Sequence, residues 1–408
     1  MIPRRVPPAH SPVPARALAE GFRALLGAPP AHAQLRELVL REFGGLDVVT
    51  AASGTCALSL VLRGAALDRP RAPVALPAYG CYDLASAAVG AGVRVVLYDV
   101  DPSTLAPDAE SFARALAAGP AAVVVAHLYG IPVDLRPLRP AVEAAGAMLI
   151  EDAAQGAGVR IGGRPAGGFG SASVLSFGRG KGVTGGGGGA LLAHDSRGEA
   201  VLRRARIAIH GTREGWAELA ALAAQWVLAR PSLYALPAAM PFLHLGETLY
   251  REPMPPEPMA DSSAAVLRTL WEGRRREADA RVRNARRLLA PAARSGDDTF
   301  PVPVGCSAGW LRLPLRARHR AHLPLSPAAE RLGIAAGYPL ALPDLPAMRA
   351  LCVNAADDFP GARRLAASLY TLPTHGLLSE ADLRGLEAWL ATRTDVVAVP
   401  APALSAAS

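Results

Sequence analysis

The sequence predicts an α/β protein with a mostly parallel sheet flanked by helices and a smaller α+β domain at its C-terminal end. Three observations predict this class. Short apolar runs alternate with alanine-rich helical segments through the first half of the chain, which is the pattern of buried parallel strands. A long charged helical segment and several shorter elements follow. The length of 408 residues exceeds what one small hydrophobic core accommodates.

Six apolar runs are predicted as strands, with helices over 83–91, 108–118 and 134–145 between the earlier ones. The last two runs are joined by a glycine-rich loop and not by a helix, so one of them can run antiparallel. The predicted strands cover residues 74–77, 93–100, 121–127, 147–152, 173–177 and 189–194.

The second half of the chain has a different pattern. Residues 262–293 read as one long charged helix. Beyond it, a strand near 310–315 is expected among helices at 326–332, 361–369 and 379–391. We therefore expect a large domain over 1–260, a small domain over 261–395, and a disordered alanine- and proline-rich tail over 396–408.

Composition excludes several classes of protein. The formal net charge is +8, but the arginines are scattered and no aromatic residues interleave with them, so a nucleic-acid partner is not expected. The four cysteines include no C-x-x-C pair, which argues against a metal site or a disulfide framework and favours the cytoplasm. The N-terminal residues contain no apolar segment typical of a signal peptide.

The most apolar stretch runs from Leu219 to Leu245, within an insertion over about 215–255. Arg230 and three prolines interrupt it, so it does not have the pattern of a transmembrane helix. Contact with a membrane surface through 219–245, or with a second subunit, stays open. We favour a buried insertion.

Only one of the 43 basic residues is a lysine, Lys181. In an open parallel sheet, ligands bind beyond the carboxyl ends of the strands. Asp152 and Ser176 close two of the predicted strands, and Lys181 follows Ser176 by five residues. Ser53, Gly54 and Thr55 open a helical segment, where free N–H groups and hydroxyls favour an anion.

This set of groups suits pyridoxal phosphate. That cofactor needs an amine for a Schiff base, a carboxylate at its pyridine nitrogen, and donors for its phosphate. Arginine cannot replace the amine, because its guanidinium stays protonated. On composition alone, chance survival of a single lysine explains the pattern equally well.

Two segments, "IEDAAQGAG" (150–158) and "FGSASVLSFGRGKGVTGGGGGALL" (169–192), resemble the DegT/DnrJ/StrS sugar aminotransferases, a family of fold-type I pyridoxal phosphate enzymes. Further likeness extends over roughly 35–390, apart from the insertion. The resemblance implies that Lys181 forms the Schiff base and moves a proton between cofactor and substrate carbons. It implies the other cofactor contacts as well: Asp152 at the pyridine nitrogen, Gln155 at the ring hydroxyl, and Ser53, Gly54, Thr55 and Ser176 at the phosphate.

The family stacks an aromatic ring on the cofactor, and the resemblance places that ring in the segment after Pro77. We choose Tyr82, with Tyr79 and Cys81 as alternatives. Two departures stand out. The glycine loop at 185–189 lacks the family's glutamate, and residues 255–267 lack the asparagine and arginine that lend phosphate contacts to a neighbouring subunit.

The resemblance implies an aminotransferase that moves an amino group from glutamate to a keto-sugar, with a nucleotide-linked sugar as the expected acceptor. Such reactions serve polysaccharide or secondary-metabolite biosynthesis. A homodimer is expected, because the family's site lies between subunits. Two alternatives stay open: an aminotransferase acting on a cyclitol or another ketone, and a non-catalytic protein that binds the cofactor.

Overall fold

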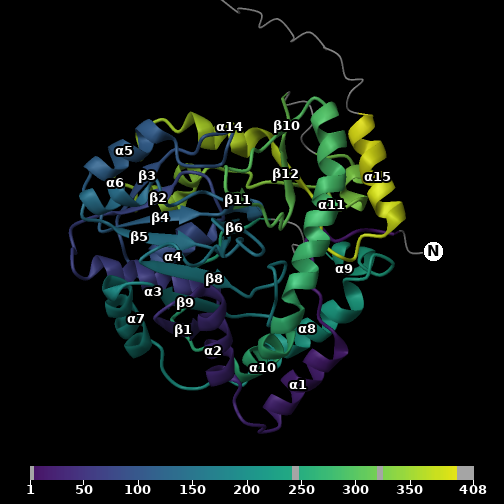
Figure 1. The fold of residues 1–408 in the computed structure, drawn as a ribbon, viewed down its shortest axis with the longest axis horizontal. Helices are drawn as coiled ribbons and strands as arrows, with labels where there is room; N and C mark the ends of the chain where they lie inside the picture. Colours follow the sequence, from purple (N-terminus) through teal and green to yellow (C-terminus); the bar gives the residue numbers. More distant parts are fainter. Residues whose placement is uncertain (1–3, 241–247, 319–324, 393–408) are drawn as a thin grey trace, which may run out of the picture.

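The structure, a computed structural model, describes residues 4–240, 248–318 and 325–392. Its centre is a seven-stranded sheet (Figure 1) in the order β1-β9-β8-β5-β4-β2-β3. The strands are β1 (Asp47–Ala51), β2 (Val74–Pro77), β3 (Val95–Tyr98), β4 (Ala122–Ala126), β5 (Met148–Asp152), β8 (Ala172–Ser176) and β9 (Gly189–Ala193).

Strand directions bring most carboxyl ends to one edge of the sheet. β8, β5, β4, β2 and β3 run parallel, whereas β9 runs antiparallel to both of its neighbours, β8 and β1. β1 therefore points the same way as β8. All six predicted strands are confirmed, including the antiparallel one. β1 was not predicted, because its five residues mix Asp47 and Thr50 with a short apolar run.

Helices cover both faces of this sheet. One face packs against α3 (Gly54–Ala66), α4 (Asp83–Ala91) and α7 (Ser196–Ala208). The other packs against α2 (His32–Phe43), α5 (Ala109–Ala117) and α6 (Arg139–Ala144). Successive strand residues enter opposite clusters: Val74 and Leu76 join the first, and Ala75 the second. This alternation is why the parallel strands read as continuous apolar runs.

A second, four-stranded antiparallel sheet lies toward the C-terminal end, in the order β10-β12-β14-β13. A third, small sheet has the order β11-β6-β7. The remaining strands are β6 (Arg160–Ile161), β7 (Arg164–Pro165), β10 (Asp298–Thr299), β11 (Cys306–Ser307), β12 (Leu313–Arg316), β13 (Ala335–Ala336) and β14 (Leu369–Leu372). Around them lie α12 (Pro327–Arg331), α13 (Pro346–Arg349), α14 (Pro360–Ser368), α15 (Glu380–Ala391) and the short 3-10 helices at Leu128–Gly130 and Leu342–Asp344.

The prediction of a single helix over 262–293 is wrong, because the structure has two helices there. α10 (Asp261–Leu270) and α11 (Arg274–Arg294) are separated by a 3-10 turn at Trp271–Gly273. α10 packs against α1 (Ala15–Leu25) and α2, and so lies with the seven-stranded sheet. α11 extends to β10 of the four-stranded sheet (Figure 1). The domain boundaries remain predictions, and the tail over 396–408 lies outside the described residues.

The insertion is only half buried, contrary to our expectation. It forms α8 (Trp216–Leu228) and α9 (Ala235–Ala238). Leu219 and Leu222 face the core, but Trp226 is 40% exposed and Val227 42%. Within the described residues, no helix is long and apolar enough to cross a membrane.

An N-terminal arm, residues 4–14, links distant parts of the chain. The Arg5 N–H donates to the Pro231 carbonyl at 2.9 Å, and the Val6 N–H to the Arg331 carbonyl at 2.8 Å. The His375 ring lies 2.8 Å from the Pro7 carbonyl. The arm therefore links the insertion to the elements around the four-stranded sheet.

Candidate active site

The carboxyl edge of the sheet brings Asp152 and Lys181 together. Asp152 ends β5, and Lys181 lies in a loop over 177–184, the lysine loop, that follows β8. Burial raises the pKa of Asp152, while the N–H of Ala154 and the positive charge of Lys181 lower it. The same amine lowers the pKa of Cys81, which burial otherwise raises. The charge of the Lys181 amine therefore reaches both groups.

The predicted phosphate contacts form a tight cradle, made of Ser53, Gly54, Thr55 and Ser176. Ser53 caps α3 by accepting a hydrogen bond from the Cys56 N–H at 3.0 Å. A Cβ atom at Gly54 would lie 2.6 Å from the Cβ of Ser176, so only glycine lets the start of α3 approach β8 this closely. The N-terminus of a 13-residue helix beside two serine hydroxyls suits a phosphate dianion.

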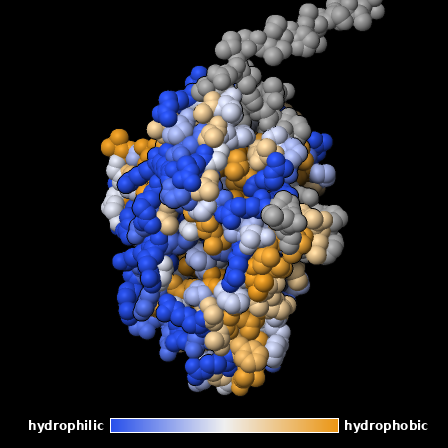
Figure 2. Space-filling model, turned by 90° about the vertical axis from the view of Figure 1, so that its right-hand side faces the viewer, coloured by the Kyte–Doolittle hydropathy of each residue, from blue (hydrophilic) through white to orange (hydrophobic). Residues whose placement is uncertain are grey.

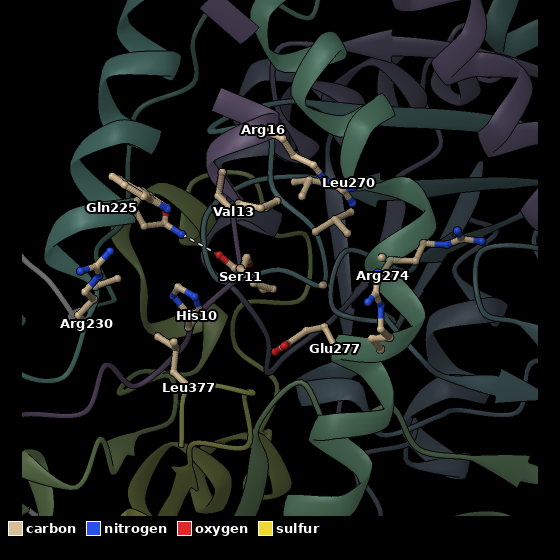
Figure 3. Close-up of a pocket in the computed structure, with 18 residues that line it drawn as sticks. His10, Ser11, Val13, Arg16, Gln225, Arg230, Leu270, Arg274, Glu277 and Leu377 are labelled. Atoms are coloured by element: carbon tan, nitrogen blue, oxygen red, sulfur yellow. Dashed lines mark hydrogen bonds between the residues drawn. The ribbon is translucent and has the colours of Figure 1, made fainter. Parts of the chain in front are cut away.

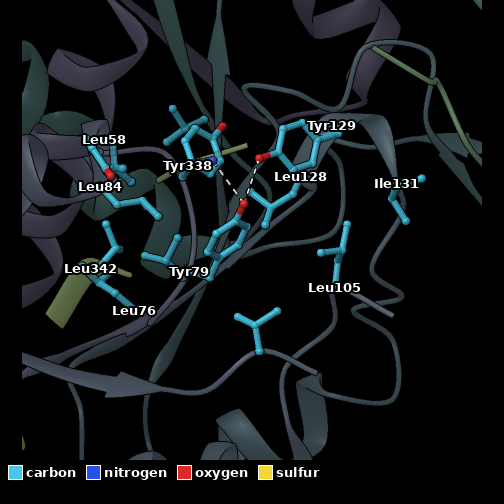
Figure 4. Packing of buried hydrophobic residues seen from close by; sticks show 14 of the residues in the cluster. Leu58, Leu76, Tyr79, Leu84, Leu105, Leu128, Tyr129, Ile131, Tyr338 and Leu342 are labelled. Carbon is cyan, nitrogen blue, oxygen red and sulfur yellow. Dashed lines mark hydrogen bonds between the residues drawn. The ribbon is translucent and has the colours of Figure 1, made fainter. Parts of the chain in front are cut away.

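Gln155 joins the large sheet to a tyrosine in the segment that follows β13. Its Oε1 accepts the Tyr129 N–H at 3.0 Å, and its Nε2 donates to the Tyr338 hydroxyl at 2.7 Å. The Tyr338 ring stacks on Tyr129 with centroids 5.5 Å apart. The Tyr79 hydroxyl accepts the Tyr338 N–H and lies 3.2 Å from the Tyr129 hydroxyl (Figure 4). Sequence reasoning missed Tyr338, which lies 183 residues from Gln155 and belongs to no pattern that links them.

Tyr82 points its hydroxyl toward the small domain. That oxygen accepts the Leu340 N–H at 2.7 Å, and the ring centroid lies 6.2 Å from that of Tyr338. Among Tyr79, Cys81 and Tyr82, Cys81 is the one whose pKa the charge of Lys181 lowers. The assignment of Tyr82 as the stacking ring remains a prediction.

A buried carboxylate next to Asp152 was also missed. Glu151 is 0% exposed, and His127 is 1% exposed with its Nε2 at 2.9 Å from Glu151. The Nδ1 of His127 accepts the Val133 N–H at 3.1 Å. The ring is therefore neutral, with its proton on Nε2, which donates to Glu151. This pair fixes the strand end that presents Asp152.

The lysine loop is held from behind by groups distant in sequence. The Ser11 hydroxyl, on the N-terminal arm, donates a short hydrogen bond to the Lys181 carbonyl. Arg281, 1% exposed on α11, donates to the His10 carbonyl at 2.8 Å and to the Lys181 carbonyl at 3.5 Å. These contacts hold the backbone of Lys181 through its carbonyl oxygen.

The donor set fits pyridoxal phosphate. The charge of an amine reaches a buried carboxylate, the glycine-lined cradle presents a helix N-terminus, and Gln155 offers polar groups beyond the end of the same strand. The described residues contain no group of three or more histidine, cysteine, aspartate or glutamate side chains placed to bind a metal ion.

Comparison with known proteins supports the resemblance. Residues 31–228 match the sequence model of the DegT/DnrJ/EryC1/StrS aminotransferase family. An L-glutamine:2-deoxy-scyllo-inosose aminotransferase of Streptomyces kanamyceticus is 35% identical over 147 residues, which is 36% of this chain and 34% of that protein. A dTDP-4-dehydro-2,3,6-trideoxy-D-glucose 4-aminotransferase of Saccharopolyspora spinosa is 35% identical over 168 residues, 41% of this chain and 43% of that one. The matched segment thus spans less than half the length of these relatives.

The fold is shared over nearly the whole chain. A protein described as a sugar aminotransferase from Streptococcus pneumoniae, solved in its PLP form, superposes with a TM-score of 0.73. The match covers 96% of this chain and 98% of that one at 17% sequence identity. The predicted class, a fold-type I α/β architecture with a mostly parallel sheet, is confirmed.

Proposed function

We propose that this chain, whose residues 31–228 belong to the DegT/DnrJ/EryC1/StrS aminotransferase family, is a pyridoxal phosphate-dependent aminotransferase acting on a keto-sugar. One observation supports this most directly. The only lysine of the chain follows β8 at the sheet edge where β5 ends in Asp152, and its charge lowers the pKa of that carboxyl. The phosphate cradle lies at the same sheet edge.

Each residue has a defined task. When bound, pyridoxal phosphate supplies an electron sink for the carbanion that forms at the substrate carbon. Lys181 holds the cofactor covalently and moves a proton at that carbon. The Asp152 carboxylate keeps the proton on the pyridine nitrogen. Burial alone would favour a neutral Asp152, so its ionised form depends on a positive partner.

The remaining groups bind and orient. Gly54, Thr55, Ser53 and Ser176 present N–H and hydroxyl donors to the phosphate. Gln155, fixed between the Tyr129 N–H and the Tyr338 hydroxyl, contacts the side of the ring that carries its hydroxyl. Tyr82 is the proposed aromatic neighbour of the ring, with Tyr79 and Cys81 as the alternatives.

The amino donor is glutamate or glutamine, and the acceptor is a keto-sugar linked to a nucleotide. Relatives named for a dTDP-linked sugar and for 2-deoxy-scyllo-inosose both match the chain, so a cyclitol ketone is the second candidate acceptor. The glycine loop at 185–189 and the segment 255–267, which lack family motifs, keep a non-catalytic cofactor-binding protein as a third possibility. A cytoplasmic homodimer fits the first two.

The test separates the two half-reactions. The holoenzyme is converted to its amino form with glutamate or glutamine, and candidate ketones are then added singly while the cofactor absorbance is followed. We expect a nucleotide-linked keto-sugar to restore the starting spectrum, and a cyclitol ketone to fail. The reverse result supports the second candidate.

Lys181→Arg is the control for chemistry. It keeps a positive charge but should abolish covalent attachment, measured by borohydride fixation followed by mass spectrometry. A folded Lys181→Arg variant that turns over would contradict the proposal. A wild-type protein that binds the cofactor yet never exchanges the α-proton of glutamate would favour the non-catalytic alternative.

A further inference from the structure

A cavity of about 570 Å³ lies behind the lysine loop (Figure 3). Its wall is formed by the N-terminal arm and the start of α1, the C-terminal part of α8, and the junction of α10 with α11. Gly182 and Val183, which follow Lys181 directly, line it, whereas Asp152, Gln155 and the phosphate cradle do not. The cavity is therefore a second site, separated from the proposed catalytic one by the backbone of the lysine loop.

The wall of this cavity is basic. Four arginines line it against a single carboxylate, Glu277. Glu277 is already engaged by the Arg281 Nε at 3.3 Å and by the Gly376 N–H at 3.2 Å. Of the arginines, Arg274 is paired with Glu42.

The other three arginines are Arg16, Arg230 and Arg276, and their side chains form no ion pair with any residue in the described ranges. Arg230 instead lies over the ring of Trp226, 5.3 Å from its centroid. The cavity thus has an excess of positive charge that the described part of the chain does not neutralise.

One polar group in the wall is buried without a partner. His10 is 9% exposed, and its Nδ1 makes no hydrogen bond within the described residues. Burial, then the charges of His375 and Arg281, lower the pKa of His10 to about 3, so the ring is neutral at physiological pH. Figure 3 shows this imidazole and the Glu277 carboxylate on opposite sides of the space. A buried nitrogen without a hydrogen-bond partner costs free energy. A ligand oxygen can accept a hydrogen bond from the His10 Nδ1 when that nitrogen carries the proton.

We propose that this cavity binds a phosphate or a phosphate ester. Guanidinium groups match phosphate oxygens in geometry and charge, and three exposed arginines line this cavity together with a neutral imidazole. The volume falls within the range of about 300–1,000 Å³ that small-molecule sites occupy. The indole of Trp226 provides an apolar surface for the remainder of the ligand.

A ligand in this cavity contacts the segment that holds the lysine loop. Ser11 lines the cavity and donates to the Lys181 carbonyl. The Gln225 amide, from α8, donates to the Ser11 carbonyl at 3.0 Å. Binding between α8 and the arm therefore fixes the element that positions the backbone of Lys181.

Two sources share the phosphate chemistry. One is a soluble phosphate ester, and the other is a phospholipid headgroup. Figure 2 views the side of the molecule that carries α1, α8 and α9, and shows hydrophobic side chains gathered beside hydrophilic ones. Trp226 and Val227 are 40% and 42% exposed, and Leu236 on α9 is 44% exposed. A lipid surface would meet these residues next to the basic wall.

The experiment uses holoenzyme, so that the cofactor occupies its own phosphate cradle. Binding of inorganic pyrophosphate is measured by calorimetry at low ionic strength. Binding to vesicles is measured by flotation, with phosphatidylglycerol mixed into phosphatidylcholine or with phosphatidylcholine alone. The test variant is Arg16→Gln/Arg230→Gln/Arg276→Gln. The control is Arg94→Gln/Arg203→Gln/Arg349→Gln, which removes three exposed arginines that do not line the cavity.

We expect wild type and control to bind pyrophosphate alike, and the test variant to bind at least about tenfold more weakly. Binding to anionic vesicles but not to pyrophosphate, with the same loss in the test variant, supports the proposal and identifies the headgroup as the source. Two results overturn it: no binding to either probe, or equal losses in the test and control variants.

Discussion

Glu151 is the most completely engaged carboxylate of the site, and removing its charge tests how the strand end before Asp152 is held. Five donors reach its two oxygens, although the side chain is 0% exposed. Oε1 accepts from the His127 Nε2 at 2.9 Å and the Gly167 N–H at 2.7 Å. Oε2 accepts from the Phe169 N–H at 2.7 Å, the Gly170 N–H at 3.3 Å and the Ser173 hydroxyl at 3.1 Å.

Glu151→Gln keeps the shape but turns one acceptor into a donor. The favoured orientation keeps the carbonyl oxygen at the Oε2 site, so the new NH₂ faces His127 and the Gly167 N–H. His127 cannot move its proton to Nδ1 without opposing the Val133 N–H. Two buried donors therefore lose their acceptor, at about 1–3 kcal/mol each. Relief of carboxylate desolvation offsets part of this, so we expect a loss of about 3 kcal/mol.

The assay is urea unfolding of wild type and Glu151→Gln across pH. Hydrogen bonds to the carboxylate lower the native pKa of Glu151 despite the opposing effect of burial. The stability contributed by ionised Glu151 is then fully present above the unfolded pKa, which is about 4.3, and is lost as pH falls through the native value. The difference between the variants should be constant at neutral pH and shrink below about pH 4.

Glu143→Gln is the matched control, since Glu143 is exposed and forms only a surface pair with Arg139; it should cost less than about 1 kcal/mol. A Glu151→Gln variant as stable as this control at pH 7 would refute the reasoning, because it would mean that the five hydrogen bonds contribute no net stability.

Three further changes test the site. Asp152→Asn should retain the cofactor on dialysis yet lower turnover at least about 100-fold; unchanged turnover would exclude a role for this carboxylate. Gly54→Ala places a methyl group 2.6 Å from the Ser176 Cβ, so it should destabilise the protein by about 1–3 kcal/mol and weaken cofactor binding, measured by fluorescence titration. Gly273→Ala, with nothing within 4 Å, serves as its control. Tyr82→Phe leaves the Leu340 N–H without its acceptor and should cost about 1 kcal/mol in thermal unfolding; no change would mean that water replaces the hydroxyl.

The sequence predicted those parts of the site that follow from sheet geometry. Because parallel strands end at a common edge, Asp152 and Ser176 could be placed together from strand positions alone. Ser53, Gly54 and Thr55 were chosen as the start of a helix that favours an anion, since the strand before them was not predicted. Lys181 was singled out as the only lysine of an arginine-rich chain, and the resemblance to the aminotransferase family supplied its expected role. Buried parallel strands were found because both of their faces need apolar residues.

What was missed depends on contacts between distant segments. Tyr338 and Arg281 reach the site from elements whose local patterns show only a loop and a charged helix. The break at Trp271–Gly273 lies within a charge pattern that continues across it. The apolar residues of the insertion show no helical periodicity that separates a buried face from an exposed one. The exposed side of α8 could therefore not be predicted.

The N-terminal arm has a consequence for the order of folding. Its docking partners include the Arg331 carbonyl, His375 and Asp382, which pairs with Arg4 at 2.5 Å. During synthesis, the arm leaves the ribosome long before these partners, so it cannot dock until residues up to Asp382 have also emerged. Docking of the N-terminal arm is thus a late event in folding. A nascent chain would form its central sheet before the arm holds the backbone of Lys181 in place.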